Sequence, residues 1–157
     1  MAIATGDVIV KFDTQDTVTT GTPGTVATTA FSVAGDVDST WTNAEDVQKA
    51  AAVLKAQFDT TMPTAGAIHL YARLLDVQDT NDIPAPDANF KSVYCGTFEI
   101  DFGQSPDVDF YMIIPEFYIP MVKTAQIIEW YIHNDATGQT IGSNWALYIT
   151  PKSTGQK

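Results

Sequence analysis

The stretch of sequence that decides the fold class is residues 67–77, where side chains that suit a buried sheet face alternate with larger or more polar ones. It reads Ala67-Ile68-His69-Leu70-Tyr71-Ala72-Arg73-Leu74-Leu75-Asp76-Val77. Even-numbered positions such as Ile68, Leu70 and Leu74 would share one face, with His69 and Arg73 on the other. Because successive side chains of a strand point to opposite sides, this period of two predicts a β-strand.

Similar alternation along the chain predicts further strands over 7–12, 25–33, 92–101, 109–119, 127–133 and 144–150. Pro115 interrupts 109–119, and a proline inside a strand indicates an edge position or a bulge. Residues 14–24, 78–88 and 134–139 are rich in Thr, Gly, Pro, Asp or Asn, a composition that is typical of loops and turns.

The segment 43–58 fits two patterns. Val47, Leu54 and Phe58 fall on one helical face, and Asn43 would suit a helix N-terminus. Residues 50–58 also alternate in the manner of a strand. We therefore predict a short helical turn over 43–48 and a strand from about residue 50 to residue 58, with a full helix as the alternative.

About eight strands without a βαβ order predict an all-β fold, namely a two-layer antiparallel β-sandwich of Greek-key or jelly-roll type. At most one short helix is expected, near 43–50. We interpret residues 1–157 as a single domain, with 1–6 and 151–157 as flexible arms.

Charge and composition exclude several classes of partner. The 157 residues carry 8 basic and 19 acidic side chains, a formal net charge of -11, which repels phosphate backbones and anionic membranes. No apolar run approaches the roughly 20 residues of a membrane span, and the start lacks the basic and apolar parts of a signal peptide. These features predict no nucleic-acid or membrane partner and synthesis in a cytosol. Cys95 is the only cysteine, and it is expected to be a buried structural thiol.

Candidate chemistry is sparse. In the acidic loop 76–87, Asp76 and Asp87 have the spacing of the first and last ligands of an EF-hand, but Gln78 and Asn81 break its pattern. We expect a solvated loop there, with an ion site as the alternative.

Other polar side chains also have ordinary explanations. His69 and His133 are the only histidines, and neither has a second metal ligand at a useful spacing. Glu99 and Asp101 would share a strand face as outward carboxylates. A Ser-His-Asp triad from distant residues stays open, but we predict no catalytic residue, metal ligand or cofactor.

Aromatic side chains are the remaining candidates for function. They would form either ordinary core, a sugar-binding face or a protein interface, where Tyr and Trp are enriched. The predicted contacts combine an apolar run around Pro120 with two tryptophans: Phe117, Tyr118, Ile119, Met121, Val122, Trp130 and Trp145.

Several strand and turn patterns between residues 45 and 155 stand out. They are Leu70-Tyr71-Ala72-Arg73-Leu74-Leu75, the run 80–90 from Thr80-Asn81-Asp82 to Asn89-Phe90, Glu129-Trp130-Tyr131-Ile132-His133-Asn134, Thr137-Gly138-Gln139-Thr140-Ile141, and the run 145–152 that begins Trp145-Ala146-Leu147-Tyr148. Together these patterns resemble a family of small virion structural proteins of tailed bacteriophages.

The resemblance implies a non-enzymatic β-sandwich that is located on the virion after synthesis in the host cytoplasm. Our leading hypothesis is a capsid decoration, or cement, protein that binds the major capsid protein or other virion subunits from outside the shell. A homo-oligomer, such as a trimer, is expected. The alternatives are a tail, baseplate or fibre component with a host-glycan-binding role and, less favoured, a glycan hydrolase.

Overall fold

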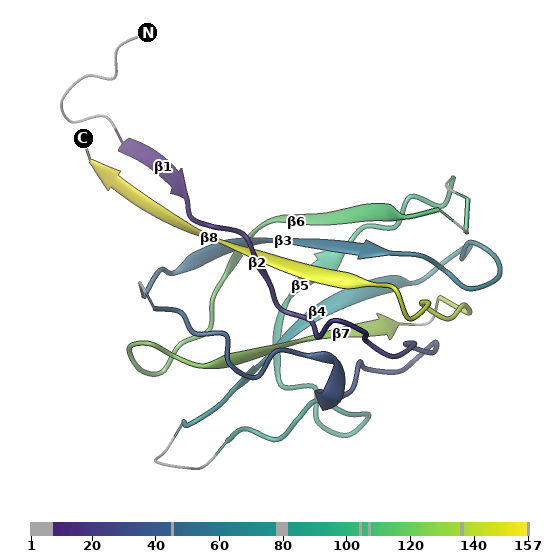
Figure 1. Ribbon diagram of the computed structural model, residues 1–157, viewed down its shortest axis with the longest axis horizontal. Helices are drawn as coiled ribbons and strands as arrows, with labels where there is room; N and C mark the ends of the chain where they lie inside the picture. The colour runs from purple at the N-terminus through teal and green to yellow at the C-terminus, as the bar shows by residue number, and fades with distance from the viewer. Residues whose placement is uncertain are drawn as a thin grey trace, which may run out of the picture.

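The computed structural model describes residues 8–44, 46–77, 82–103, 105–106, 108–135 and 137–156. Two antiparallel sheets face each other, and the only helical element in these ranges is the 3-10 turn η1 (Ala34–Asp36) (Figure 1). The strands are β1 (Val8–Phe12), β2 (Asp16–Thr17), β3 (Lys49–Ala56), β4 (Ala67–Leu74), β5 (Val93–Phe98), β6 (Phe110–Tyr118), β7 (Ile128–Asp135) and β8 (Ala146–Gln156). The predicted all-β sandwich is confirmed.

The strand order gives the sandwich a jelly-roll winding. One sheet has the order β1-β8-β3-β6, with β2 also beside β8, and the other has the order β5-β4-β7. Residues 26–32 follow the free side of β7, where Ser32 N donates to Ile132 O and Asn134 N donates to Ala30 O. When this segment is counted as a strand, four pairs of neighbours are nested in chain order: β1 with β8, 26–32 with β7, β3 with β6, and β4 with β5. This nested pairing of the two halves of the chain is that of a jelly roll.

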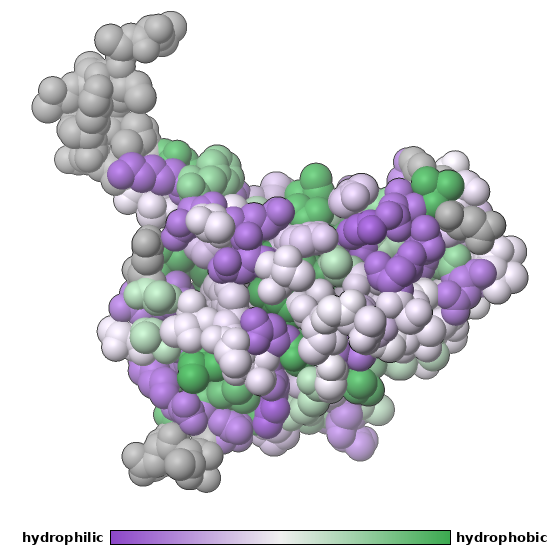
Figure 2. Space-filling model, in the orientation of Figure 1, coloured by the Kyte–Doolittle hydropathy of each residue, from purple (hydrophilic) through white to green (hydrophobic). Residues whose placement is uncertain are grey.

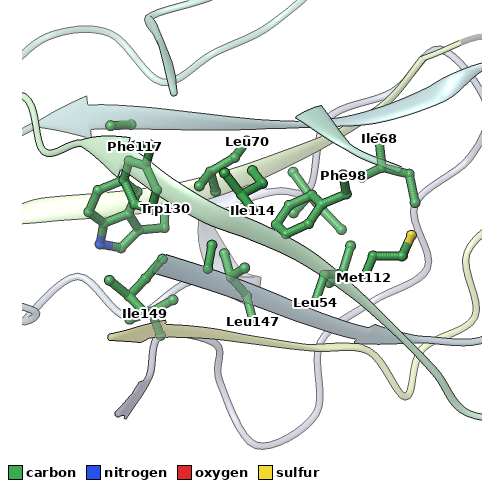
Figure 3. Close-up of a cluster of buried hydrophobic side chains, with 14 of the residues drawn as sticks. Leu54, Ile68, Leu70, Phe98, Met112, Ile114, Phe117, Trp130, Leu147 and Ile149 are labelled. Atoms are coloured by element: carbon green, nitrogen blue, oxygen red, sulfur yellow. The ribbon is translucent and has the colours of Figure 1, made fainter. Parts of the chain in front are cut away.

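The core fills the space between the two sheets and receives side chains from both (Figure 3). Trp130 of β7 is fully buried in this core, edge-on to the rings of Trp41 and Phe117 at centroid distances of 5.4 and 5.5 Å. Leu54 of β3 and Leu70 of β4 are fully buried from opposite sheets. Burying each such side chain stabilises the fold by about 1.5–3 kcal/mol, so the core can hold the sheets together without a disulfide or metal.

The expected strand over 25–33 is not a regular strand. Val26 and Phe31 form isolated bridges to Ile141 and His133. Between these bridges the chain turns, because Ala30 N donates to Ala27 O and Thr29 adopts a positive φ of 63°. The β-branched residues of 25–33 therefore form an interrupted strand that runs beside β7.

The expected helical turn over 43–48 and the alternative of a full helix are both wrong. Residues 49–56 form β3, which pairs with β6 on one side and β8 on the other, so backbone pairing on both sides overrides any helical preference. Before β3, the buried Asn43 side chain accepts from Val47 N and donates to Val47 O, at 3.1 and 2.8 Å. That amide closes a loop in which Asp46 has a positive φ of 52°.

Other boundaries also differ from the expected ones. Residues 151–156, which were expected as an arm, form the end of β8, which continues to Gln156 and pairs with β1 in register from Phe12–Lys152 to Val8–Gln156. Residues 1–6 lie outside the described residues. The strand expected over 92–101 ends at Phe98, and β2 lies inside the expected loop 14–24. The edge or bulge expected at Pro115 is confirmed, since β6 is an edge strand and its register with β3 shifts there.

Candidate functional site

The outward side of the β6–β3–β8 sheet exposes several large apolar side chains. We call this surface the outer sheet face, and it consists of Lys49, Val53, Lys55, Tyr111, Ile113, Tyr118 and Tyr148. Strand alternation explains it, because the side chains between these, such as Met112 and Leu147, point into the core. Tyr111, Ile113 and Tyr118 are all more than half exposed.

Strand register gathers these side chains into rows. Val53 lies opposite Ile113 on β6 and opposite Tyr148 on β8, so three apolar side chains cross the sheet in one line. Lys55 lies opposite Tyr111, and Lys49 lies opposite Tyr118. The outer sheet face is thus an apolar strip with a lysine near each end.

Ion pairs hold the two lysines in place. Lys49 Nζ is 2.7 Å from Glu116 Oε1 and 5.3 Å from the centroid of the Tyr118 ring, and Lys55 Nζ is 2.7 Å from Asp109 Oδ2. The hydrogen bond that Lys49 donates to Glu116 raises the pKa of Lys49, so this lysine stays charged. An apolar centre with a polar, charged rim is the usual anatomy of a protein–protein interface.

The structure separates the predicted interface residues into two groups. Phe117, Ile119, Trp130 and Trp145 are core side chains, so the prediction that they form surface contacts is wrong for the folded chain. Trp130 is completely buried between the sheets, and the indole of Trp145 faces inward and donates to Gly24 O at 2.8 Å. Residue type alone does not decide burial, because burial depends on which side of the strand a side chain occupies.

The remaining predicted contacts lie at or near the surface. Tyr118 is 71% exposed and Val122 is 59% exposed. Met121 is half-buried, with its sulfur 2.6 Å from Asn43 Nδ2. Whether these three make contacts stays a prediction. Tyr111 belongs to the aromatic side chains that the sequence offers for a sugar-binding face or a protein interface, whereas Ile113 is not among the predicted contacts, although the alternation of 109–119 places both on one side of β6.

On the opposite surface of the molecule, four polar side chains form a chain across β7, β4 and β5. Asp135 Oδ2 lies 3.3 Å from His69 Nε2, and His69 Nδ1 lies 2.8 Å from Thr97 Oγ1. Tyr94 Oη is 2.6 Å from the same threonine oxygen. The order carboxylate, imidazole, hydroxyl is that of a catalytic triad. Here, however, the Thr97 hydroxyl is shared between the ring and the phenol, so the contacts serve to tie β5 to β4.

His133 is the neighbour of His69 across the β4–β7 ladder, with ring centroids 6.2 Å apart. Phe31 stacks on the His133 ring at 4.2 Å, and His133 Nε2 lies 3.3 Å from Thr29 O. Burial lowers the pKa of His133, more than the Thr29 carbonyl raises it. A neutral His133 therefore holds the 26–32 segment beside β7 through its contacts with Phe31 and Thr29.

An ion pair between Arg73 and Glu129 holds a second segment of the chain against the same sheet. Arg73 donates to Glu129 Oε2 at 2.8 Å and to Ile83 O at 2.6 Å, and the Tyr131 hydroxyl donates to Glu129 as well. Burial is the main reason that the pKa of Tyr131 is raised, so its hydroxyl remains protonated and able to donate. These contacts hold the chain at 82–85 against β4 and β7, which explains why both faces of β7 are buried.

Arg73 also approaches the loop 76–87, for which an ion site is the alternative prediction. Asp82 accepts from Asp76 N at 2.8 Å and lies 3.7 Å from Arg73, while Asp87 accepts from Asn89 N and Phe90 N. The part of the loop at 78–81 lies outside the described residues. Within the described ranges, no group of three or more His, Cys, Asp or Glu side chains is placed to hold a metal ion.

Two further predicted positions have local explanations. Glu99 and Asp101 follow β5 rather than lying on it, and with Asp109 they border a hollow of about 350 Å³ at the start of β6. Cys95 is partly buried, and desolvation raises the pKa of its thiol to about 12. Its Sγ faces Val93 O at 3.5 Å, as expected for a structural thiol.

Comparison of this chain with protein-family models, with curated proteins and with solved structures finds no match. The described ranges contain no helix with the length and apolar character needed to cross a membrane. The candidate site therefore rests on its geometry alone.

Proposed function

We propose that the chain is a non-enzymatic structural subunit of a tailed-bacteriophage particle, which decorates the outside of the capsid by docking through its outer sheet face. The observation that carries this proposal is the apolar strip of Ile113, Val53 and Tyr148 on the solvent side of the sheet. The location on a phage particle is inferred from the sequence resemblance to small virion proteins. The attachment through the outer sheet face is inferred from the apolar strip.

The physical case rests on the cost of leaving this strip in water. A specific interface buries about 800 Å² on each partner, and its fully buried centre is more apolar than the surrounding surface. Tyr111 and Tyr118 would supply rigid contact area around Ile113, and aromatic side chains of this kind dominate binding energy. The Lys49–Glu116 and Lys55–Asp109 pairs would then form a solvated rim.

The fold supports a structural role only by analogy. Jelly rolls occur in viral capsid proteins, and they also occur in lectins and other proteins, so the winding alone does not decide the function. Many copies on a regular shell would each bind the major capsid protein or another virion subunit, and repetition would add to the strength of the layer. The protein would be made in the host cytoplasm and then located on the virion.

The test is co-sedimentation of the purified chain with assembled phage shells, with a tail fraction in parallel. Saturable binding at a fixed ratio to the major capsid subunit is expected. Ile113→Ser should weaken this binding at least tenfold, because it removes the centre of the strip. Val33→Ser is the matched control, since Val33 is also more than half exposed but lies next to η1, outside the outer sheet face.

Two results would contradict the proposal. Binding confined to tails or host cells would favour the tail, baseplate or fibre alternative and would direct the work to glycan screening. Shell binding by Ile113→Ser that equals the binding of the unmodified chain would show that the outer sheet face is not the contact. Circular dichroism of both variants checks that they are folded.

A further inference from the structure

A row of four side chains crosses the sheet at one end of the outer sheet face. Tyr118 on β6 lies opposite Lys49 on β3. Lys49 lies opposite Lys152 on β8, which in turn lies opposite Phe12 on β1. We call these four residues the lysine row. Because directly opposite residues of antiparallel strands point to the same side of a sheet, all four side chains lie on the solvent side.

The lysine row extends the outer sheet face onto the ribbon that the two ends of the described chain form. Beyond Lys152 the described residues of β8 pair only with β1, and this ribbon projects from one corner of the molecule (Figure 1). Val10 is on the same side of β1 as Phe12, and the two are 55% and 64% exposed. In Figure 2 hydrophobic residues lie on the surface beside this projecting end, among hydrophilic ones. The surface proposed for docking therefore extends as far as β1.

The two lysines are like charges in directly opposite positions, an arrangement that by itself destabilises a sheet. Each ammonium group lies over the aromatic ring at its own end of the row. Lys49 Nζ is 5.3 Å from the centroid of Tyr118, and Lys152 Nζ is 5.2 Å from the centroid of Phe12. Such contacts contribute about 0.5–1 kcal/mol each at exposed sites and leave the positive charge in place.

One carboxylate serves both lysines. Lys49 donates to Glu116 at 2.7 Å, and this hydrogen bond lowers the pKa of Glu116, to which the charge of Lys152 also contributes. Lys152 donates to Pro115 O, a neutral acceptor that leaves the charge uncompensated and further N–H donors of the ammonium group available. In the part of the chain that the structure describes, no carboxylate lies within ion-pair distance of Lys152.

The lysine row therefore differs in charge from the rest of the chain. Lys49, Lys152 and Glu116 together carry +1, and because the whole chain has a formal charge of -11, the remainder carries -12. A nucleic acid or an anionic membrane presents negative charge over a wide area and would be repelled by that remainder. A single carboxylate on a protein surface can approach the row alone, because exposed charges are screened beyond about 8 Å at physiological salt. Charge thus favours an acidic side chain of a protein partner.

We infer that the lysine row binds an acidic side chain of the virion subunit on which the outer sheet face docks. The partner's carboxylate would accept hydrogen bonds from Lys152 and Lys49, and the exposed rings of Tyr118 and Phe12 would flank it. This inference rests on the proposed capsid docking and deepens it, because it states the chemistry of the partner surface. That surface would present an Asp or Glu side chain beside an apolar patch that covers Ile113.

The test is co-sedimentation of the full chain with assembled phage shells at several salt concentrations. Lys152→Met keeps an unbranched stem beside Phe12 and removes the charge. It should weaken binding about tenfold at about 50 mM salt and less at about 500 mM, because salt screens the ion pair that is lost. Lys152→Arg keeps the charge and should retain most of the binding. Lys11→Met is the matched control, since Lys11 pairs with Ser153 on the same ribbon and its side chain lies on the opposite side.

Cross-linking with a carbodiimide locates the contact directly, because this reagent joins an amine to a carboxylate that touches it. Mass spectrometry of the treated complex should find Lys152 joined to an Asp or Glu of the shell subunit. Lys49 is less informative, since Glu116 of its own chain is already 2.7 Å away. A cross-link from Lys11 to the shell in equal yield would contradict the inference.

The outcomes separate this inference from the docking proposal on which it rests. If Ile113→Ser weakens shell binding and Lys152→Met does not, docking through the outer sheet face stands and the role of the lysine row is refuted. Equal weakening by Lys11→Met, or binding that does not change with salt, would also refute that role. Failure of the unmodified chain to bind shells would overturn both. Thermal unfolding checks that each variant is folded.

Discussion

The two sheets approach each other closely at a glycine, and replacing this residue should destabilise the fold. Gly96 lies in β5, where a Cβ atom would be 3.0 Å from Cδ1 and 3.2 Å from Cγ2 of Ile114 on β6. Its φ is not in the positive range that excludes other residues. Gly96→Ala therefore tests packing between the sheets without backbone strain.

Two opposing effects set the magnitude. Replacing glycine by alanine within a strand gains about 0.5–1 kcal/mol, because the unfolded chain loses freedom. Forcing a methyl group into a filled core costs about 1–3 kcal/mol. The steric cost should prevail, since both contacts are to a branched side chain rather than to the flexible end of a long one. We expect Gly96→Ala to lower the free energy of unfolding by about 1 kcal/mol, or roughly 2–4 °C in Tm.

A double-mutant cycle separates this clash from other effects. Ile114→Val removes the atom nearest to the added methyl and alone should cost about 0.5–1.5 kcal/mol. The double variant should be more stable than the sum of the two changes by about 1 kcal/mol, as measured by urea unfolding. Gly21→Ala is the control, because a Cβ there meets nothing within 4 Å and should not destabilise the fold. Additivity within about 0.5 kcal/mol, or stabilisation by Gly96→Ala, would refute the packing argument.

Three further predictions concern buried polar groups. Because burial lowers the pKa of His133, the unfolded state binds a proton more readily. The free energy of unfolding should therefore fall as pH drops below about 6.5. In His133→Phe the fall between about pH 7 and about pH 5 should be smaller. An equal fall in the variant and the unmodified chain would contradict this prediction. Arg73→Met should lower the free energy of unfolding by about 2–4 kcal/mol in urea unfolding, because Glu129 stays buried without its cation. Combining Arg73→Met with Glu129→Gln should recover part of this loss. Trp145→Phe should lower the free energy of unfolding by about 2–3 kcal/mol in thermal unfolding, because Gly24 O loses its donor and a cavity forms. A loss below about 0.5 kcal/mol would contradict the assignment of this indole to the core.

The candidate site was only partly predictable from sequence. The run 117–122 correctly indicated an apolar region near the end of β6, and Tyr118 and Val122 are exposed there. The sequence offers Tyr111 only as one of many aromatic candidates, and it does not indicate Ile113 at the centre of the outer sheet face. Both sides of β6 are apolar, so alternation along this strand defines two faces without showing which one is covered.

By itself, the sequence determined the local structure, because a period of two along 67–77, 127–133 and 144–150 is a property of neighbouring residues. It also determined the acidic charge and the edge position of Pro115. Only the tertiary structure decided that 49–56 extends as a strand, that residues after Pro151 pair with β1, and that Trp130 is buried. Each of these depends on pairing or packing between segments far apart in the chain, whose free energy exceeds the small local preferences that sequence patterns report.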